Sequence, residues 1–319
     1  MYYSDDEEDT EKMSEESKSV SLASGKLRIP KTRKIKSSIA SRNKKMFENG
    51  HLYHINGISL NSDGEHFITS DELRINLWNL NVTNKVFSLI DIKPDSINEL
   101  NEVITSSEFH PSDGNMLIYS SSKACINLLD LRINSSFLNS TSTFQIDTPE
   151  HKKNFFTDIL NSISDARFSD HGPFIYSRDY LAIRIWDLRN SKSPLSVIRV
   201  CDYLEKKLCD LYENESIFDK FPIATSPDSK YIMTGAYDSF HVIDRNSRCN
   251  VEIPAQFYPD NYPKVGKVRY YGEVKNIEEV SEEINFTKPI LRYAWDPKLN
   301  TLAVSNHNCL FVYHSEKES

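Results

Sequence analysis

An internal repeat that begins at about residue 54 constrains the fold of this chain more than any other feature. Each copy holds a short apolar strand, a polar turn rich in Asp, Gly or Ser, a second apolar strand, and a third that ends near Asp or Arg. With the turn residues Gly64, Gly114, Gly172, Ser229 and Asn300 in register, the steps between copies are 50, 58, 57 and 71 residues. Repetition on this scale, with several short strands per unit, is typical of a β-propeller. The five copies run over residues 54–80, 104–132, 162–189, 216–246 and 290–314.

Turn chemistry and alternation predict the strands of each copy. Asp-Gly, or a residue in its place, allows the positive φ of a tight hairpin turn. The alternation at residues 184–186 suits a strand packed between neighbouring blades. Trp78, Trp186 and Trp295 lie at equivalent or nearby strand positions, so we expect them to pack between blades. The only Trp-Asp pair is Trp186-Asp187. We therefore predict an all-β protein, a divergent WD40-type β-propeller.

Length and composition narrow the class of protein. A chain of 319 residues can bury roughly three quarters of its unfolded surface. No apolar run approaches the roughly 18 to 20 residues of a membrane helix, and the acidic residues 1–9 are the reverse of a signal peptide's start. We expect a soluble cytoplasmic protein. The five cysteines are never spaced as Cys-x-x-Cys, and only nine residues are glycine. Neither a disulfide framework, a metal site nor a phosphate-binding cofactor loop is predicted. Helical periodicity is weak except at residues 202–213.

Charge divides the chain into three segments. Residues 1–25 form a predicted disordered acidic tail, because residues 1–17 hold eight acids against one base. Residues 26–50 form a basic segment, with nine bases and no acid between 26 and 45. One interpretation is a nuclear-localisation or nucleic-acid-binding segment, in which case part of the protein would be nuclear. The other, which we favour, is a solvated linker. The propeller, residues 51–319, is acidic. This argues against nucleic acid as the main ligand and favours basic protein segments as partners.

Long runs outside the generic repeat carry a family resemblance. They include YSSSKACINLLDLR, RDYLAIRIWDLRN and DYLEKKLCDLYENESIFDKF, and the matching runs together cover residues 54–64, 71–80, 89–111, 119–132, 154–169, 178–190, 202–221, 233–240 and 290–297. The chain resembles the WD-repeat regulatory B subunits of serine/threonine protein phosphatase 2A. The resemblance implies a seven-bladed propeller that docks on a helical-repeat scaffold (A) subunit and presents phosphoprotein substrates to a separate catalytic (C) subunit.

The chain departs from the family where the first two blades and the scaffold-gripping hairpin are expected. Only five copies are recognisable, and the acidic tail and basic segment stand in place of the rest. A propeller that stops short exposes inter-blade faces and strand edges. Three interpretations remain: the chain is the product of a truncated gene model, it closes as a five-bladed ring, or it depends on a partner. We favour the first.

The resemblance also selects site residues. A groove that recognises substrates maps here to Tyr53, His54, Asp71, Glu72, Leu73, Leu100 and Val103. Carboxylates beside apolar side chains suit basic, amphipathic segments. The alternative for Asp71 and Glu72 is a hairpin turn that caps its own backbone. A second stretch near the mouth of the ring holds Glu213, Asp219 and Lys220, for which the alternative is a connecting loop with surface ion pairs.

The functional prediction is a non-catalytic subunit that recruits basic phosphoproteins to the phosphatase. No helix is predicted to carry His51, His54 and Asp71, so their spacing does not indicate a metal or catalytic site, and no nucleophile motif lies beside them. The histidines are therefore expected to pack in the fold or to line the groove. The alternative is a WD-repeat scaffold or competitor that no longer assembles with the phosphatase. A propeller enzyme is the third and least favoured interpretation.

Overall fold

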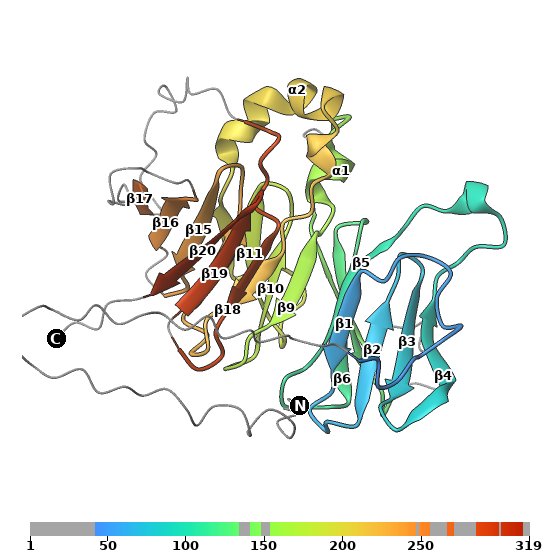
Figure 1. Ribbon diagram of the computed structural model, residues 1–319. Coiled ribbons are helices and arrows are strands. Elements are labelled where there is room, and N and C mark those ends of the chain that lie inside the picture. Colours follow the sequence, from blue (N-terminus) through green and yellow to red (C-terminus); the bar gives the residue numbers. More distant parts are fainter. Residues whose placement is uncertain are drawn as a thin grey trace, which may run out of the picture. The chain divides into compact units, whose positions relative to one another are not determined.

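The computed structural model describes residues 42–133, 141–147, 154–246, 249–255, 267–270, 285–299 and 301–314 (Figure 1). The chain divides into two units, Met1–Lys44 and Lys45–Ser319. The predicted acidic tail and residues 26–41 of the predicted basic segment lie outside the described residues. Residues 45–50 of that segment belong to the second unit, so the compact unit begins before the predicted boundary at residue 51.

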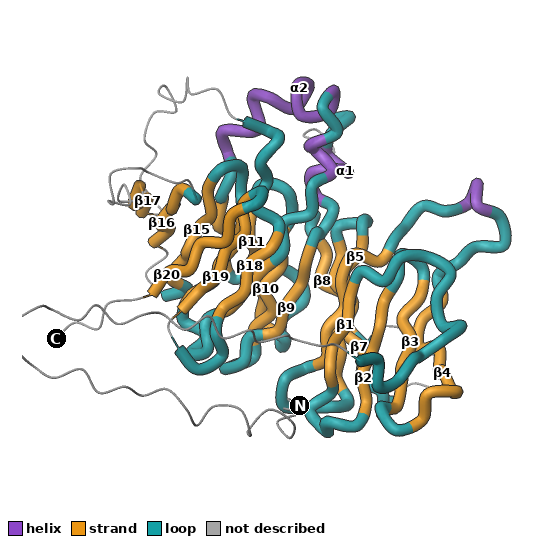
Figure 2. The backbone as a smooth tube through the Cα atoms, in the orientation of Figure 1, coloured by secondary structure: helices purple, strands orange, loops and turns teal. Residues whose placement is uncertain are grey.

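Five antiparallel sheets follow one another along the second unit, and each corresponds to one copy of the repeat (Figure 2). In each sheet, neighbouring strands are consecutive in sequence. This confirms the all-β prediction and the five recognisable copies. Sheet 1 contains β1 (Gly57–Leu60), β2 (His66–Ser70), β3 (Arg74–Asn79) and β4 (Val82–Asp91); sheet 2 contains β5 (Ile104–Phe109), β6 (Met116–Ser121), β7 (Cys125–Asp130) and β8 (Ser142–Gln145); sheet 3 contains β9 (Asp165–Phe168), β10 (Phe174–Arg178), β11 (Ala182–Asp187) and β12 (Ser196–Arg199); sheet 4 contains β13 (Ile223–Thr225), β14 (Tyr231–Gly235), β15 (Ser239–Asp244), β16 (Cys249–Pro254) and β17 (Lys267–Tyr270); sheet 5 contains β18 (Arg292–Trp295), β19 (Thr301–Asn306) and β20 (Cys309–His314).

The turns between the first and second strands confirm the predicted turn residues in three copies and correct one. Gly64, Gly172 and Ser229 have positive φ, at 68°, 94° and 53°. Gly114 is not in this conformation; it is required for close packing instead. A Cβ there would lie 2.3 Å from Oδ1 of Asn61, whose side-chain amide donates to the Gly114 carbonyl at 2.9 Å. The glycine therefore lets the turns of sheets 1 and 2 touch. Asn300 lies outside the described residues.

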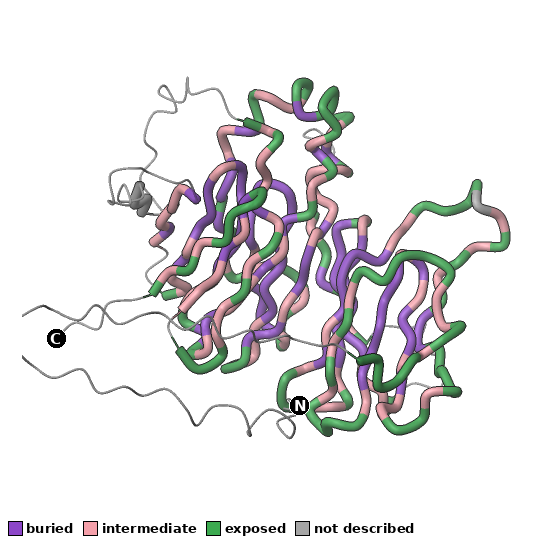
Figure 3. The backbone as a smooth tube through the Cα atoms, viewed as in Figure 1, coloured by how far each residue is buried: buried purple, intermediate pink, exposed green. Residues whose placement is uncertain are grey.

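Apolar side chains are buried between consecutive sheets, and exposed residues gather at the turns (Figure 3). Between sheets 2 and 3, for example, Ile118 and Ile126 pack with Phe168 and Trp186. The Trp186 ring meets Phe144 of β8 edge-on, with centroids 5.8 Å apart. Trp295 lies on the first strand of sheet 5 and stacks on Tyr231 of sheet 4. These two tryptophans pack between sheets, as the sequence predicts.

Trp78 is also buried, but its neighbour comes from the segment before β1. Phe47 contacts Trp78 and Phe67 edge-on, at centroid distances of 5.6 and 5.1 Å. The Trp78 ring nitrogen donates to the Thr69 hydroxyl at 2.7 Å, as that of Trp186 does to Ser177 at 2.9 Å. The third strands of sheets 1 and 3 are thus anchored to their second strands in the same way.

The long connections between sheets lie at one end of the sheets, which we call the connection end. Here the turn between the second and third strands is hydrogen-bonded to the connection into the next sheet. The Ile104 N–H donates to the Glu72 backbone carbonyl at 2.8 Å, and the Val200 N–H donates to the Leu181 backbone carbonyl at 2.9 Å. The short helices of the unit lie in these connections: η1 (Ile97–Glu99), α1 (Thr157–Asn161), η3 (Asp202–Lys207), α2 (Leu208–Glu213) and η4 (Ser216–Phe218). The helical prediction at residues 202–213 is confirmed, whereas α1 was not predicted.

Candidate functional site

The connection end of sheets 1 and 2 brings together the seven residues predicted to line a groove. Asp71, Glu72 and Leu73 form the β2–β3 turn. The Ile92 N–H donates to the Leu73 carbonyl at 2.9 Å, which ties this turn to the start of the β4–β5 connection. Leu100 and Val103 lie in that connection, and Tyr53 and His54 lie just before β1. The structure therefore places the predicted residues in this turn, in the β4–β5 connection and in the segment before β1, all at the connection end.

Asp71 does not fit the predicted contact with a partner, because its side chain is fully buried. The carboxylate accepts the N–H groups of Leu73 and Arg74, both at 2.7 Å, and lies 2.8 Å from Nδ1 of His51. Asp71 thus caps its own turn, which is the alternative that the sequence left open. Leu73 is also buried, so it supports the turn from below rather than lining its surface.

His51 continues this network into the sheet. Its Nε2 lies 2.5 Å from the Thr69 hydroxyl, which already accepts the Trp78 N–H. These partners fix the tautomer: Thr69 donates to Nε2, and Nδ1–H donates to Asp71. A hydroxyl, an imidazole and a carboxylate in this order resemble a hydrolase triad, but Thr69 is buried and its oxygen is occupied. The network holds the fold of sheet 1, and of the two histidines only His54 is exposed.

Glu72 carries the charge at the surface of this turn. It is half-buried, and its Oε2 is enclosed without a hydrogen-bond partner among the described residues. A buried carboxylate oxygen is costly unless a donor reaches it. The residue as a whole is half-buried, so its negative charge can still attract an incoming Lys or Arg side chain.

A second carboxylate of this surface, Glu102, was missed by sequence reasoning together with its partner. Lys123 in the β6–β7 turn lies 3.7 Å from Glu102 Oε2. Val103 beside it is half-buried and bonds twice to Ser122, since each N–H donates to the other residue at 3.0 Å. Leu100 is exposed. The acid-and-apolar surface, defined as Tyr53, Glu72, Leu100, Glu102 and Val103, therefore carries a cation of its own.

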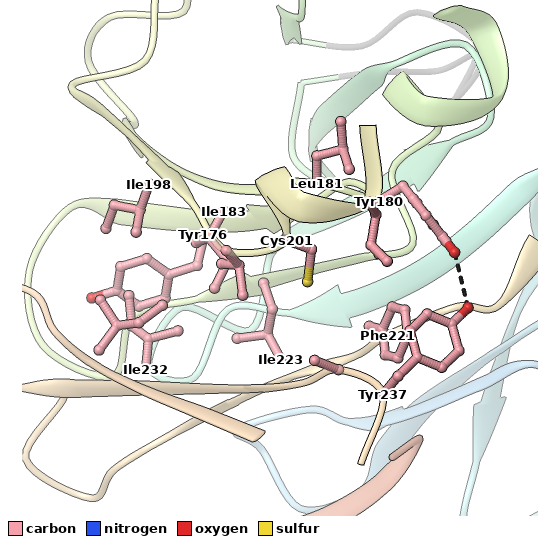
Figure 4. Close-up of a cluster of buried hydrophobic side chains, with 14 of the residues drawn as sticks. Tyr176, Tyr180, Leu181, Ile183, Ile198, Cys201, Phe221, Ile223, Ile232 and Tyr237 are labelled. Atoms are coloured by element: carbon pink, nitrogen blue, oxygen red, sulfur yellow. Dashed lines mark hydrogen bonds between the residues drawn. The ribbon is translucent and has the colours of Figure 1, made fainter. Parts of the chain in front are cut away.

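The second predicted stretch, in the connection between sheets 3 and 4, divides into exposed and anchored residues. Glu213 at the end of α2 and Lys220 after η4 are exposed. Asp219 is half-buried and accepts the Tyr237 hydroxyl at 2.9 Å. Burial raises the pKa of Asp219, and this hydrogen bond acts against the rise. Tyr237 in turn bonds to Tyr180 at 2.9 Å, and both belong to the apolar cluster between sheets 3 and 4 (Figure 4). Asp219 therefore positions η4.

Four aromatic side chains beside this stretch form a patch that the sequence reasoning missed. Tyr212 of α2 lies 5.6 Å from Phe155, 5.9 Å from Phe156 and 6.1 Å from Phe218 between ring centroids. Phe155, Tyr212 and Phe218 are exposed, unlike most large aromatics of the chain. The exposed acids around this aromatic patch are Asp158, Asp210, Glu213 and Glu215. Its signal in the sequence was its position within two of the matching runs, residues 154–169 and 202–221, which folding brings together.

Two searches of the described residues gave negative results. No group of three or more His, Cys, Asp or Glu side chains there is arranged to hold a metal ion. No helix in the same part of the chain is long and apolar enough to cross a membrane.

The repeated sheets, with a tryptophan of the third strand bonded to a hydroxyl of the second, define a WD-repeat β-propeller protein. No protein-family profile matches the chain. Curated relatives do. A 55 kDa regulatory B subunit (beta isoform) of serine/threonine-protein phosphatase 2A from Carassius auratus is 40% identical over 294 residues, which are 91% of this chain and 66% of the relative. A phosphatase 2A regulatory subunit from Dictyostelium discoideum is 42% identical over 90% of this chain and 61% of its own length. The 55 kDa regulatory subunit of phosphatase PP2A from Drosophila melanogaster is 42% identical over 91% of this chain and 59% of its own.

The chain therefore belongs to the family of 55 kDa regulatory B subunits of protein phosphatase 2A, as the sequence runs indicated. It spans about three fifths to two thirds of the length of these relatives.

Proposed function

We propose that this chain is a non-catalytic regulatory subunit of a phosphatase 2A-type enzyme, and that it recruits basic phosphoproteins to the catalytic subunit through its connection end. Its relatives are named regulatory subunits, which supports the regulatory role. The expected partners are a scaffold subunit, a catalytic subunit and substrate proteins. By holding a substrate near another subunit's active site, such a surface raises the effective concentration of its phosphosites there.

The observation that carries this proposal is the pairing of carboxylates with apolar side chains at one turn. Glu72 has one carboxylate oxygen without a donor among the described residues, and Glu102 contacts the exposed Lys123 at 3.7 Å and the Cys125 thiol at 3.8 Å. Tyr53 and Leu100, from the segments that adjoin this turn, are exposed. A segment with Lys or Arg next to an aliphatic residue satisfies both parts of this surface.

The aromatic patch offers a second contact for the same kind of partner. Exposed aromatic side chains are enriched at protein interfaces because they bury much area with few rotatable bonds. The four exposed acids around the patch again favour a cationic partner, and they would disfavour an acidic one.

The test measures two bindings of the full chain. Fluorescence anisotropy follows a labelled basic phosphopeptide that contains Lys, Arg and Leu, and affinity capture follows the scaffold and catalytic subunits. We expect Glu72→Lys to weaken peptide binding at least about tenfold and to leave capture of the subunits unchanged. The matched control is Glu65→Lys, the same charge reversal in the exposed β1–β2 turn at the opposite end of sheet 1.

Each interpretation has its own outcome. If both variants bind the peptide as the wild type does, the acid-and-apolar surface is not the recruitment site. A chain that binds the peptide but captures neither phosphatase subunit is instead the alternative scaffold or competitor. Phosphatase activity of the purified chain alone would contradict a non-catalytic role.

A further inference from the structure

Phe218 of the aromatic patch lies on a short segment that needs support from elsewhere in the fold. The segment follows Glu215, which has a φ of 59° although it is not a glycine. A side chain in this conformation costs energy, and it persists where the surrounding structure holds it. Within η4, Ile217 is buried and Phe218 is exposed, and Asp219 after it is half-buried. The position of the exposed ring therefore depends on what holds η4.

Two tyrosine hydroxyls from neighbouring sheets reach this segment. Tyr180 lies in the β10–β11 turn of sheet 3 and Tyr237 in the β14–β15 turn of sheet 4, and their oxygens are 2.9 Å apart (Figure 4). Both hydroxyls lie within hydrogen-bond distance of the Ser216 carbonyl, at 3.1 and 2.8 Å, and Tyr237 donates to Asp219 at 2.9 Å. The two sheets therefore bind the first residue of η4 and the residue that follows it.

The protons of these hydroxyls can be assigned, because each hydroxyl has only one. An ionised Asp219 only accepts, and hydrogen bonds to a charged acceptor are the stronger kind, so the Tyr237 proton is directed at the carboxylate. The Tyr180 proton then serves the Tyr237 oxygen or the Ser216 carbonyl. Both tyrosines are buried, so bulk water does not replace a hydrogen bond that is lost here.

The Tyr237 ring is fixed as firmly as its hydroxyl. It meets Phe221 and Phe286 edge-on, each with ring centroids 5.5 Å apart. A rigid, buried ring thus presents a hydroxyl at a defined place beside η4. Replacing Tyr237 by phenylalanine would keep this packing and remove the hydroxyl alone.

We propose that Tyr180 and Tyr237 are positioning residues for partner recruitment. Their hydroxyls fix η4, so that Phe218 is held beside Tyr212, 6.1 Å away between ring centroids, before a partner arrives. The inference rests on the proposed role of the aromatic patch as a contact and adds what keeps that patch in place. A surface that is ordered in advance loses less conformational freedom on binding, and it therefore binds more tightly.

The first test compares Tyr237→Phe with a matched control in the full chain. Tyr237→Phe should weaken binding of the labelled basic phosphopeptide about three- to tenfold and speed up hydrogen exchange at residues 216–219. The control, Tyr176→Phe, also removes a buried hydroxyl from the same apolar cluster, but that hydroxyl bonds to Ser169 at 3.1 Å, in the β9–β10 turn at the opposite end of sheet 3. It should lower stability without changing either binding or this exchange.

A double-mutant cycle tests whether Tyr237 acts through Phe218. Phe218→Ala removes the exposed ring itself and should weaken binding of the same peptide. The variant that carries both substitutions should bind no more weakly than Phe218→Ala alone, because a ring that is absent cannot be positioned. Independent effects that add in the double variant would contradict the proposal.

A pair of substitutions at Asp219 separates positioning from direct attraction of a cationic partner. Asp219→Leu removes the acceptor of the Tyr237 hydroxyl and should weaken binding as Tyr237→Phe does. Asp219→Asn keeps an oxygen for that hydroxyl without the charge, and it should restore most of the binding that Asp219→Leu loses. Equal losses in the two variants would show that the charge itself is what matters and would overturn the positioning role.

The remaining outcomes separate this inference from the proposed function. If Phe218→Ala weakens binding and Tyr237→Phe does not, the patch is a contact but the tyrosines do not position it. Equal weakening by Tyr176→Phe would assign the effect to a general loss of stability and would also overturn the proposal. If Phe218→Ala binds the peptide like the wild type, this inference fails, whereas the acid-and-apolar surface is judged by Glu72→Lys alone.

Discussion

Replacing Asp71 by alanine is the sharpest test of the assignment of this residue to the fold rather than to the binding surface. The variant loses two backbone N–H contacts of 2.7 Å and the contact with His51 at 2.8 Å, all in a buried position. Asp63, in the β1–β2 turn, offers a matched control. Its carboxylate accepts the N–H groups of Glu65 and His66 at 2.8 and 2.9 Å and contacts the His66 ring at 2.6 Å, but its side chain is 41% exposed.

The two aspartates therefore make the same set of bonds and differ in burial. Hydrogen bonds to a charged group contribute about 1.5–3 kcal/mol each, and donors left unpaired in the interior lose more than donors that water can reach. We expect Asp71→Ala to lower the free energy of unfolding by about 3–5 kcal/mol, in line with the breaking of other buried polar networks. Asp63→Ala should cost about 1 kcal/mol or less, because water replaces the carboxylate.

Urea unfolding followed by tryptophan fluorescence measures both values, and the Trp78 ring reports directly on this network through Thr69. Equal losses in the two variants would refute the argument from burial. A stable Asp71→Ala variant with impaired peptide binding would return Asp71 to the binding surface.

Three other predictions follow from single contacts. Lys123→Met should free Glu102 and strengthen binding of the basic peptide several-fold, and the effect should vanish in a Glu102→Gln background, as a double-mutant cycle of anisotropy titrations would show. Burial raises the pKa of Glu108 from 4.5 to about 7, against the attraction of a neighbouring arginine. The folded chain then holds a proton that the unfolded chain has lost, so stability should fall as pH rises from 4.5 to 7, and Glu108→Gln should flatten that part of the urea-midpoint profile. Gly235→Ala would put a Cβ 1.9 Å from the Ile290 carbonyl oxygen, and thermal melting should show a loss of about 2–3 kcal/mol.

The sequence predicted the fold well because the repeat is local. A strand, a polar turn and a second strand can be recognised within one copy, and each copy became one sheet. The helical stretch at residues 202–213 was equally local. Contacts between copies were less accessible. Neither the role of Phe47 over Trp78 nor the meeting of Phe155 with Tyr212 has a spacing that marks it, because folding alone brings these residues together.

The residues of the candidate site could be located but not oriented from the sequence. The β2–β3 turn selected by the resemblance lies at the connection end, yet the resemblance treated Asp71 and Glu72 alike. Asp71 is fully buried, whereas Glu72 is half-buried. A turn of three residues places adjacent side chains in different surroundings, and the residue types alone do not say which one points inward.

Comparison between copies would have distinguished them. In sheet 3 the first residue of the equivalent turn is again an aspartate, Asp179, whose buried carboxylate accepts the N–H groups of Leu181 and Ala182 at 2.8 and 2.7 Å. An aspartate at the same position of sheets 1 and 3 serves what these two sheets share, which is the turn itself. The next position differs between these two sheets. It is Glu72 in sheet 1 but Tyr180 in sheet 3, where the hydroxyl anchors the connection that carries η4. A function specific to sheet 1 is expected where its turn differs from that of sheet 3, and this is why we propose Glu72 for the recruiting charge and Asp71 for the stability of the turn.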